Sequence, residues 1–222
     1  MTKLKEAMSW FKTQFKSQIE VGIHDTPFTL DMLTAIAVQE TYYIWGNLYK
    51  GMSVTEVLKL CVGDTVDAPG RSAFPRDKAQ LLSVPKGDEM FAIAREALVS
   101  MAHYVPGYSG VASKPNKFCH GFGIFQYDLQ FFKENPDYFL KKRWSDFDEC
   151  LKVFIGELKD ALKRIYPHKS TLTDEERVYV AIAYNTGSVN FAKKFKQGYR
   201  DDSGKYYGEY IWEYLQLAKS VT

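Results

Sequence analysis

Apolar residues at the start of the chain recur at the three- and four-residue spacing of an amphipathic helix. Leu4, Met8, Phe11, Phe15 and Ile19 form this run, and most of the positions between them are polar. The pattern predicts that the chain opens with a helix that buries one face.

A second helix is predicted from Thr29 to about Trp45. Thr29 can cap its N-terminus, and Asp31 lies in the first turn, where negative charge stabilises a helix. Pro27 separates this helix from the first one. Its apolar face comprises Leu33, Ile36, Ala37 and Ile44.

Three further helices are predicted in the last third of the chain. The first begins near residue 145 and ends at Pro167, and its buried stripe comprises Phe147, Leu151, Phe154, Leu158, Leu162 and Ile165. The second carries a capping box, Thr173 with Glu176, and stops near Gly187. The third spans about Glu209 to Ala218.

The middle of the chain has weaker patterns. Ser53 with Glu56 predicts a short capped helix, and Asp88 can cap a longer one. Residues 62–76 are rich in Gly, Pro and Asp, and this composition predicts a loop. Residues 106–115 are predicted to form a second loop.

Alternating β patterns are scarce, and neither a repeat nor a linker is evident. A length of 222 residues with 45% apolar residues suits one large domain with a substantial core. We therefore predict a mainly α-helical fold. It would be a single domain over residues 1–222, in which about 46–116 form a long insertion.

Composition argues against several classes of protein. The formal net charge is +2 and no dense Lys/Arg stripe occurs, which argues against nucleic-acid binding. No segment is apolar enough to span a membrane, and the charged N-terminus lacks a signal-peptide core. The cysteines (Cys61, Cys119 and Cys150) and the four histidines lack metal-ligand spacing, so we expect neither metal nor cofactor. Reduced, buried thiols are expected, with one disulfide as the alternative.

Glu40 is the first candidate for chemistry. It shares a helix face with Leu33 and Ile36, and that face must point inward. Burial disfavours the charged form of a carboxyl group, and cleavage of a glycosidic bond needs a protonated carboxyl at the leaving oxygen. The alternative is a glutamate at a helix end that pairs with a nearby Lys or Arg, and spacing alone favours this alternative.

Two later segments are candidates for ligand contacts. Residues 121–128 contain two glycines two positions apart, which allow close backbone approach, followed by a glutamine and an aspartate. Without a third glycine and a βαβ pattern, this segment is not a dinucleotide fingerprint. Residues 183–187 end a predicted helix with Tyr184 and Asn185, which either stop the helix or bind a sugar or its acetamido group.

Together these segments resemble the goose-type lysozymes and soluble lytic transglycosylases. Residues 37–41, Ala-Val-Gln-Glu-Thr, look like the end of the family's catalytic helix, where Gln/Arg-Glu-Ser is usual. Residues 120–128, His-Gly-Phe-Gly-Ile-Phe-Gln-Tyr-Asp, resemble the goose-type Asn-Gly-Phe-Gly-Leu-Met-Gln-Val-Asp. Residues 181–187, Ala-Ile-Ala-Tyr-Asn-Thr-Gly, resemble Ala-Tyr-Asn-Ala-Gly. The motifs keep the family's order, and the likeness covers about half of the chain, roughly 29–45, 117–132 and 147–190.

The resemblance implies a lysozyme-like fold and a role for each matched residue. Glu40 aligns with the catalytic acid, and Asp128 aligns with a carboxylate proposed to help position the hydrolytic water. Other matched residues are implied to contact the saccharide: Gly123 and Gln126 on the cleft floor, Tyr184 and Asn185 near the cleavage point, and Thr41, which keeps the hydroxyl of the family's serine.

The insertion of residues 46–116 departs from the family, which has only a short loop there. Goose-type enzymes place another aspartate in that loop, and Asp64 and Asp67 are the candidates for it. The simpler alternative for each is a solvated loop aspartate. Arg71 could pair with either of them or with a substrate carboxylate.

The predicted function is that of a peptidoglycan-cleaving glycosidase, or muramidase. Glu40 would be the general acid at the β-1,4 bond between N-acetylmuramic acid and N-acetylglucosamine. Asp128 or Asp64 would activate water, with its carboxyl group about 6.5–9.5 Å from that of Glu40 so that the water fits between them. Alternatives are a lytic transglycosylase that yields 1,6-anhydro products, a chitin or chitosan hydrolase, and a non-catalytic glycan-binding domain on the same fold.

This function implies a place of action and partners. The expected ligand is peptidoglycan or a related β-1,4 amino-sugar polymer, bound by a monomer in the periplasm or cell wall. Without a signal peptide, the protein would leave the cytoplasm by lysis, through a secretion machine, or as part of a longer polypeptide. Delivery machinery or a protein inhibitor would be further partners.

Overall fold

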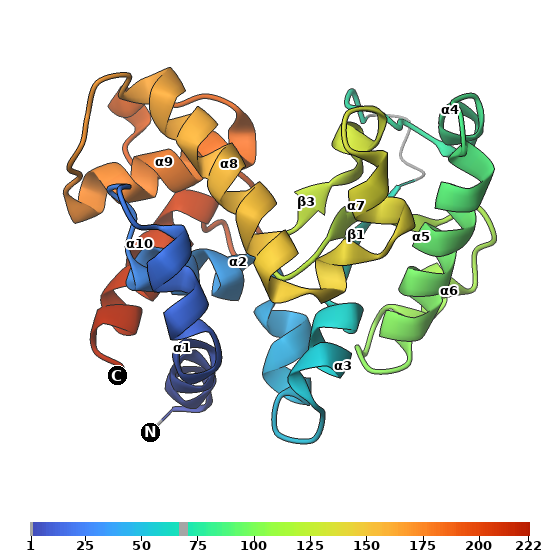
Figure 1. The fold of residues 1–222 in the computed structure, drawn as a ribbon, viewed down its shortest axis with the longest axis horizontal. Coiled ribbons are helices and arrows are strands. Elements are labelled where there is room, and N and C mark those ends of the chain that lie inside the picture. Colours follow the sequence, from blue (N-terminus) through green and yellow to red (C-terminus); the bar gives the residue numbers. More distant parts are fainter. Residues whose placement is uncertain (1, 67–70) are drawn as a thin grey trace. The chain divides into compact units, whose positions relative to one another are not determined.

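The protein is mainly α-helical over residues 2–66 and 71–222, the residues that the computed structural model describes (Figure 1). Helices account for 61% of the described residues, and a small three-stranded antiparallel sheet accompanies them. The predicted fold class is confirmed at this level.

The elements within the described ranges follow one another in this order. The helices are α1 (Lys3–Gly22), α2 (Leu30–Leu48), α3 (Val54–Leu60), α4 (Lys78–Leu82), α5 (Gly87–Ala102), α6 (Ser109–Ala112), α7 (Pro136–Leu140), α8 (Phe147–Ile165), α9 (Asp174–Thr186) and α10 (Tyr207–Lys219). The strands are β1 (Val62–Val66), β2 (Phe118–Phe122) and β3 (Tyr127–Asp128). Three short 3-10 helices are η1 (Leu129–Lys133), η2 (Arg143–Ser145) and η3 (Phe191–Lys193).

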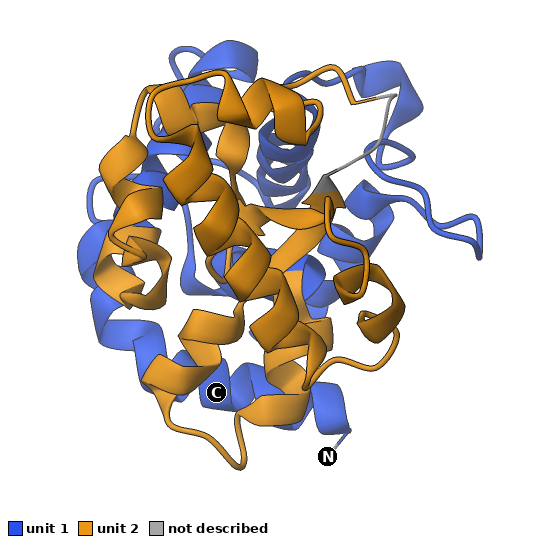
Figure 2. Cartoon of the chain, turned by 90° about the vertical axis from the view of Figure 1, so that its right-hand side faces the viewer, with its two compact units in different colours: residues 1–40, 151–222 blue, residues 41–150 orange. Residues whose placement is uncertain are grey.

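The chain divides into two compact units (Figure 2). Unit 1 comprises residues 1–40 and 151–222, and unit 2 comprises residues 41–150. The two boundaries fall inside α2 and α8. The prediction of one domain with an insertion at 46–116 stays a prediction.

Unit 1 is built mainly from long helices whose apolar stripes and caps follow the sequence pattern. The stripe of α1 is buried as predicted at Met8, Phe11, Phe15 and Ile19. The predicted cap of α2 is confirmed, because the Thr29 hydroxyl accepts a hydrogen bond from the Met32 backbone N–H at 3.2 Å. The apolar face of α2 within this unit is fully buried at Leu33, Ile36 and Ala37. Local periodicity and capping therefore define these two helices.

The later helices of unit 1 end as their sequences predict. Thr173 and Glu176 form the predicted capping box of α9. Gly187 caps its C-terminus with a left-handed φ of 79°, a conformation that favours glycine. α10 packs along α9 and covers the predicted segment 209–218 with a few residues more.

Unit 2 contains the sheet, and here one prediction is wrong. The sequence predicts a loop over residues 62–76, but β1 occupies the first part of that range. β1 pairs antiparallel with β2, with Val62 opposite Phe122 and Thr65 opposite Cys119, and β2 pairs in turn with β3. The partner strand lies far along the sequence, so no local pattern reveals the pairing.

Two helical segments of unit 2 also differ from expectation. Asp88 is predicted to cap a helix, but α5 begins at Gly87 and its N-cap residue is Lys86, two positions before the predicted cap. Asp88 therefore lies in the first turn. A Cβ at Gly87 would overlap the Leu81 carbonyl oxygen, so the close contact with α4 needs glycine at the helix start. The loop predicted at 106–115 contains the single turn α6.

The chain contains 15 phenylalanines and 15 tyrosines, and several of them form an aromatic core. In unit 2 the Phe122 ring packs against Phe139 and Trp144, with centroid distances of 5.4 and 4.8 Å, and the Tyr127 ring packs against Tyr138 and Phe139 at 5.0 and 5.5 Å. Such rings bury large apolar areas. The free, buried thiols predicted for the three cysteines are confirmed.

Within the described residues, no helix combines the length and apolar character needed to cross a membrane.

Candidate functional site

Glu40 lies on α2 with a half-buried side chain, and it is hydrogen-bonded to a tyrosine of α10. The Tyr207 hydroxyl donates a hydrogen bond to Glu40 Oε1 at 2.9 Å. Tyr207 is only 2% exposed. Burial, followed by the negative charge of Glu40, raises the pKa of Tyr207 well above its ordinary value, so the phenol keeps its proton. Glu40 therefore has a permanent neutral donor beside it.

Tyr207 is not among the site residues predicted from the sequence. It lies at the start of α10, 167 residues after Glu40, and its own surroundings in the sequence resemble an ordinary helix start. No local signal distinguishes it from the other tyrosines of the chain.

The predicted saccharide contacts of unit 1 lie at the end of α9. Tyr184 is half-buried and packs edge-on against Phe154, with ring centroids 5.2 Å apart. Tyr184 also contributes to the raised pKa of Tyr207, which relates it to the Glu40 group. Asn185 is exposed. Unit 1 thus brings Glu40, Tyr207 and Tyr184 into one neighbourhood and leaves the Asn185 side chain accessible.

In unit 2, Asp128 is the centre of a charged cluster at the end of β3. Arg71 Nη2 donates to Asp128 Oδ1 at 2.6 Å, and His120 Nδ1 lies 2.8 Å from Asp128 Oδ2. The Gln130 backbone N–H donates to Oδ1 at 2.7 Å. Burial alone would raise the pKa of Asp128, but the hydrogen bond and charge of His120 and the charge of Arg71 outweigh it and lower the pKa. Asp128 is therefore held as a carboxylate.

Asp64 lies near the other ring nitrogen of His120 and is in a different environment from Asp128. His120 Nε2 is 3.9 Å from Asp64 Oδ2, while Nδ1 of the same ring faces Asp128. The Asp64 side chain is 69% exposed. Its backbone has a φ of 46°, which is uncommon for a residue with a side chain and is tolerated best by Asp and Asn. His120 thus links one enclosed and one open carboxylate.

Arg71 was predicted to pair with Asp64, with Asp67 or with a substrate carboxylate. It pairs with Asp128, and its guanidinium also donates to the Phe74 and Pro75 carbonyl oxygens at 3.3 and 3.2 Å. These carbonyls hold the side chain toward Asp128. Asp67 lies outside the described residues.

Gln126 and the glycines of its motif fit together closely. Gln126 has a φ of 58°, and its Nε2 donates to the Gly123 carbonyl at 2.8 Å. A Cβ at Gly121 would overlap Gln126 Oε1, and a Cβ at Gly63 on β1 would come within 2.7 Å of it. Glycine at 121 and 63 therefore clears the space that the Gln126 amide fills.

Gly123 itself serves the core of unit 2. Its φ is 87°, and a Cβ there would lie 2.6 Å from Cys150 Sγ and 3.0 Å from the Tyr138 hydroxyl oxygen. Its backbone N–H donates to the Cys61 carbonyl at 2.8 Å. The Gly-x-Gly pattern is thus explained by packing around the hairpin, whatever contact the backbone makes with a ligand.

Thr41 and Trp45 are enclosed in unit 2. Thr41 is fully buried, and its hydroxyl donates to the Ile124 carbonyl at 2.7 Å. This geometry favours a positioning role for Thr41, since its hydroxyl binds the hairpin that carries Gln126. Trp45 is also fully buried and belongs to the core of this unit.

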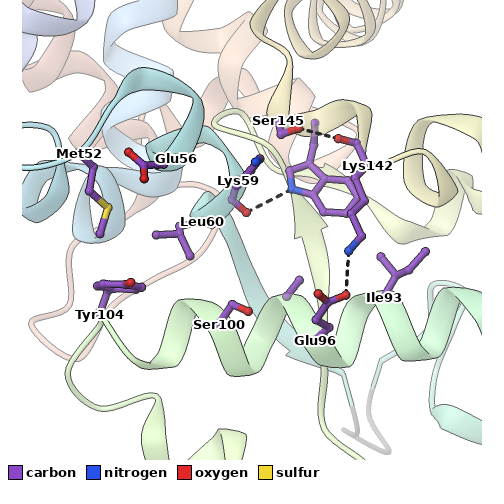
Figure 3. Close-up of a pocket in the computed structure, with 12 residues that line it drawn as sticks. Met52, Glu56, Lys59, Leu60, Ile93, Glu96, Ser100, Tyr104, Lys142 and Ser145 are labelled. Atoms are coloured by element: carbon purple, nitrogen blue, oxygen red, sulfur yellow. Dashed lines mark hydrogen bonds and ion pairs between the residues drawn. The ribbon is translucent and has the colours of Figure 1, made fainter.

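A separate hollow of about 480 Å³ occurs in unit 2 (Figure 3). Its walls are mostly apolar and include Leu60, Ile93 and Trp144. The Lys142–Glu96 ion pair, 2.7 Å between Nζ and Oε2, spans one side of it. None of the predicted site residues lines this hollow, so the candidate site is distinct from it.

In the part of the chain that the structure describes, no group of three or more His, Cys, Asp or Glu side chains is placed to hold a metal ion. The candidate residues themselves carry carboxyl, imidazole, phenol and amide groups. No family model, curated protein or solved structure matches the chain.

Proposed function

We propose that the protein is a lysozyme-like glycosidase that cleaves β-1,4 bonds of peptidoglycan, with Glu40 as general acid. The proposed fold is a lysozyme-like helical domain in which residues 46–116 are an insertion. The observation that best supports the proposal is the pairing of β1 with β2. This pairing brings Asp64, from the insertion, to His120 and Asp128 of the goose-type motif.

In the proposed reaction, Glu40 protonates the glycosidic oxygen between N-acetylmuramic acid and N-acetylglucosamine, and an oxocarbenium-like transition state follows. The Tyr207 hydroxyl orients the Glu40 carboxyl group through its hydrogen bond. Tyr184 and the accessible Asn185 contact the sugar. The reaction takes place in the periplasm or cell wall.

The geometry favours Asp64 over Asp128 as the carboxylate that activates water. Asp128 accepts hydrogen bonds from Arg71 and from a backbone N–H, contacts His120, and has a lowered pKa, which together make it a weak base. Asp64 is open to solvent, and the His120 ring lies beside it. Asp128 then acts as a positioning residue for His120 and Arg71.

A lytic transglycosylase is the second candidate within this fold. In that reaction the muramic 6-hydroxyl attacks in place of water, Glu40 acts first as acid and then as base, and no second carboxylate is needed. The exposure of Asp64 is compatible with this route, because an exposed carboxylate can also be a plain surface residue. The same scaffold could also cleave a chitin-type substrate, or bind a glycan without cleaving it.

Mass spectrometry of digested peptidoglycan separates these reactions. Purified protein and its Glu40→Gln variant are incubated with peptidoglycan and with N-acetylglucosamine oligomers. Reducing muramic ends that are absent with the variant are the expected result and support hydrolysis. Products lighter by one water identify a lytic transglycosylase. Cleavage of the oligomers alone points to a chitinase, and cleavage of neither substrate contradicts the enzymatic proposal.

A further inference from the structure

Two tyrosines of unit 2 form a stacked pair that the proposed reaction does not use. The rings of Tyr43 and Tyr108 are nearly parallel, at 13°, with centroids 6.0 Å apart. The Tyr108 hydroxyl donates to the Tyr43 hydroxyl oxygen at 3.4 Å. Tyr43 is 38% exposed and Tyr108 is half-buried, so the pair reaches the surface.

The pair adjoins the charged cluster of Asp128, His120, Arg71 and Asp64, which we call the sheet cluster. A Cβ at Gly63 on β1 would overlap the Tyr43 hydroxyl and lie 2.7 Å from Gln126 Oε1, so both polar groups converge over this glycine. Asp64 directly follows this glycine in the chain, and its charge adds to burial in raising the pKa of Tyr43 and of Tyr108. Two stacked rings therefore lie beside the open carboxylate of the cluster.

The two tyrosines come from different parts of the sequence. Tyr43 belongs to α2, three residues after Glu40, whereas Tyr108 precedes α6 within the insertion. The loop around Tyr108 therefore completes the pair, and a chain without the insertion would lack its second ring.

We propose that the Tyr43–Tyr108 pair stacks on a pyranose ring of a β-1,4-linked amino-sugar strand, so that the insertion supplies a saccharide subsite beside Asp64. The C–H face of a sugar is apolar and its rim is polar. An exposed tyrosine ring with an adjacent hydroxyl and amide matches both parts. This inference rests on the proposed function and adds to it the ring contacts that hold the glycan.

The inference is tested with Tyr108→Ala and with Tyr104→Ala as the matched control. Tyr104 is 47% exposed and comes from the same region, but it lines the separate hollow rather than the sheet cluster. Tyr108→Phe keeps the ring and removes the hydroxyl. KM and kcat are measured on soluble, uncrosslinked peptidoglycan strands. Affinity for N-acetylglucosamine hexamer is measured by calorimetry in the Glu40→Gln background, and thermal unfolding of each variant checks the fold.

We expect Tyr108→Ala to raise KM and the dissociation constant by roughly tenfold, with kcat changed much less. Tyr108→Phe should retain most of the affinity, and Tyr104→Ala should bind like the parent. If the parent cleaves glycan and Tyr108→Ala keeps the parent's KM and affinity, the subsite is refuted while the proposed function stands. If the parent neither cleaves nor binds any of these glycans, both are refuted.

Discussion

The carboxyl groups of the two units are held by different kinds of partner. In unit 1, Glu40 lies on a helix whose buried face is mostly apolar, and it accepts a hydrogen bond from the neutral, buried phenol of Tyr207. In unit 2, Asp128 is bound by the cationic Arg71 and contacts His120. A neutral donor favours the charged form of its partner less strongly than a cation does. The surroundings of Glu40 therefore suit proton donation better than those of Asp128.

A second contrast lies within unit 2, between the enclosed Asp128 and the open Asp64. The Asp128 side chain is 23% exposed and that of Asp64 is 69% exposed, and the His120 ring lies between them. The oxygens of Asp128 are occupied by contacts with other protein groups, whereas the Asp64 carboxylate is open to solvent. Alignment with a family carboxylate therefore does not by itself identify the water-activating base.

The largest expected effect is on turnover, from Asp64→Asn. If Asp64 activates water, this change should lower kcat roughly 10²–10⁴-fold while thermal unfolding stays unchanged, because the side chain is exposed. Steady-state kinetics on peptidoglycan measure it. Unchanged kcat together with anhydro products would assign the reaction to a transglycosylase and leave Asp64 a surface residue.

The two units also differ in how closely other atoms surround a motif glycine. Gly123 in unit 2 and Gly187 in unit 1 both have left-handed φ, at 87° and 79°, but a Cβ would lie 2.6 Å from Cys150 Sγ at Gly123 and meets nothing within 4 Å at Gly187. Backbone strain alone should make Gly187→Ala cost about 1–2 kcal/mol of unfolding free energy. Added overpacking should bring Gly123→Ala to about 2–5 kcal/mol. Urea denaturation measures both, and equal losses would show that the hairpin can relax around the extra methyl.

These differences also explain what could be predicted from the sequence. The α1 stripe, the α9 capping box and Gly187 depend on neighbours within a few residues, so local patterns were sufficient for them. β1 was missed because its hydrogen bonds go to β2, from a distant part of the chain. At the candidate site, Glu40 and Asp128 were found from their motifs. Tyr207 was not found, and Arg71 was named with other partners, since the two lie 167 and 57 residues from Glu40 and Asp128 and only the fold brings them together.

The ionic enclosure of Asp128 predicts a pH-dependent loss of stability. Its pKa is lower in the folded protein than in the unfolded chain, so its ionised form stabilises the fold above the unfolded pKa of about 3.9. That contribution is lost as the pH falls through the lower folded pKa. Near neutral pH, Asp128→Asn should cost about 1–3 kcal/mol of unfolding free energy.

The difference between parent and Asp128→Asn should shrink in acid below the unfolded pKa, as measured by urea denaturation at several pH values. Asp137→Asn is the matched control, because Asp137 also forms an ion pair, at 2.6 Å with Lys141, but on an exposed surface. It should change stability little at any pH. A difference for Asp128→Asn that is constant with pH would contradict the enclosure of its charge.

The smallest expected effect concerns the neutral donor beside Glu40. Tyr207→Phe keeps the buried ring and removes the hydroxyl that donates to Glu40 Oε1. Loss of one such bond should lower kcat/KM by roughly three- to tenfold. The bond favours the charged form of its partner, so without it the carboxyl group should stay protonated to higher pH. A general acid works in its protonated form, and the alkaline limb of the kcat/KM profile should therefore move to higher pH.

The control is Tyr179→Phe. Tyr179 is a half-buried tyrosine on α9, and its change should leave the profile in place. An alkaline limb that stays fixed in Tyr207→Phe would mean that a group other than Glu40 sets it. The difference between a neutral and a cationic partner would then not explain why Glu40 rather than Asp128 is the proton donor.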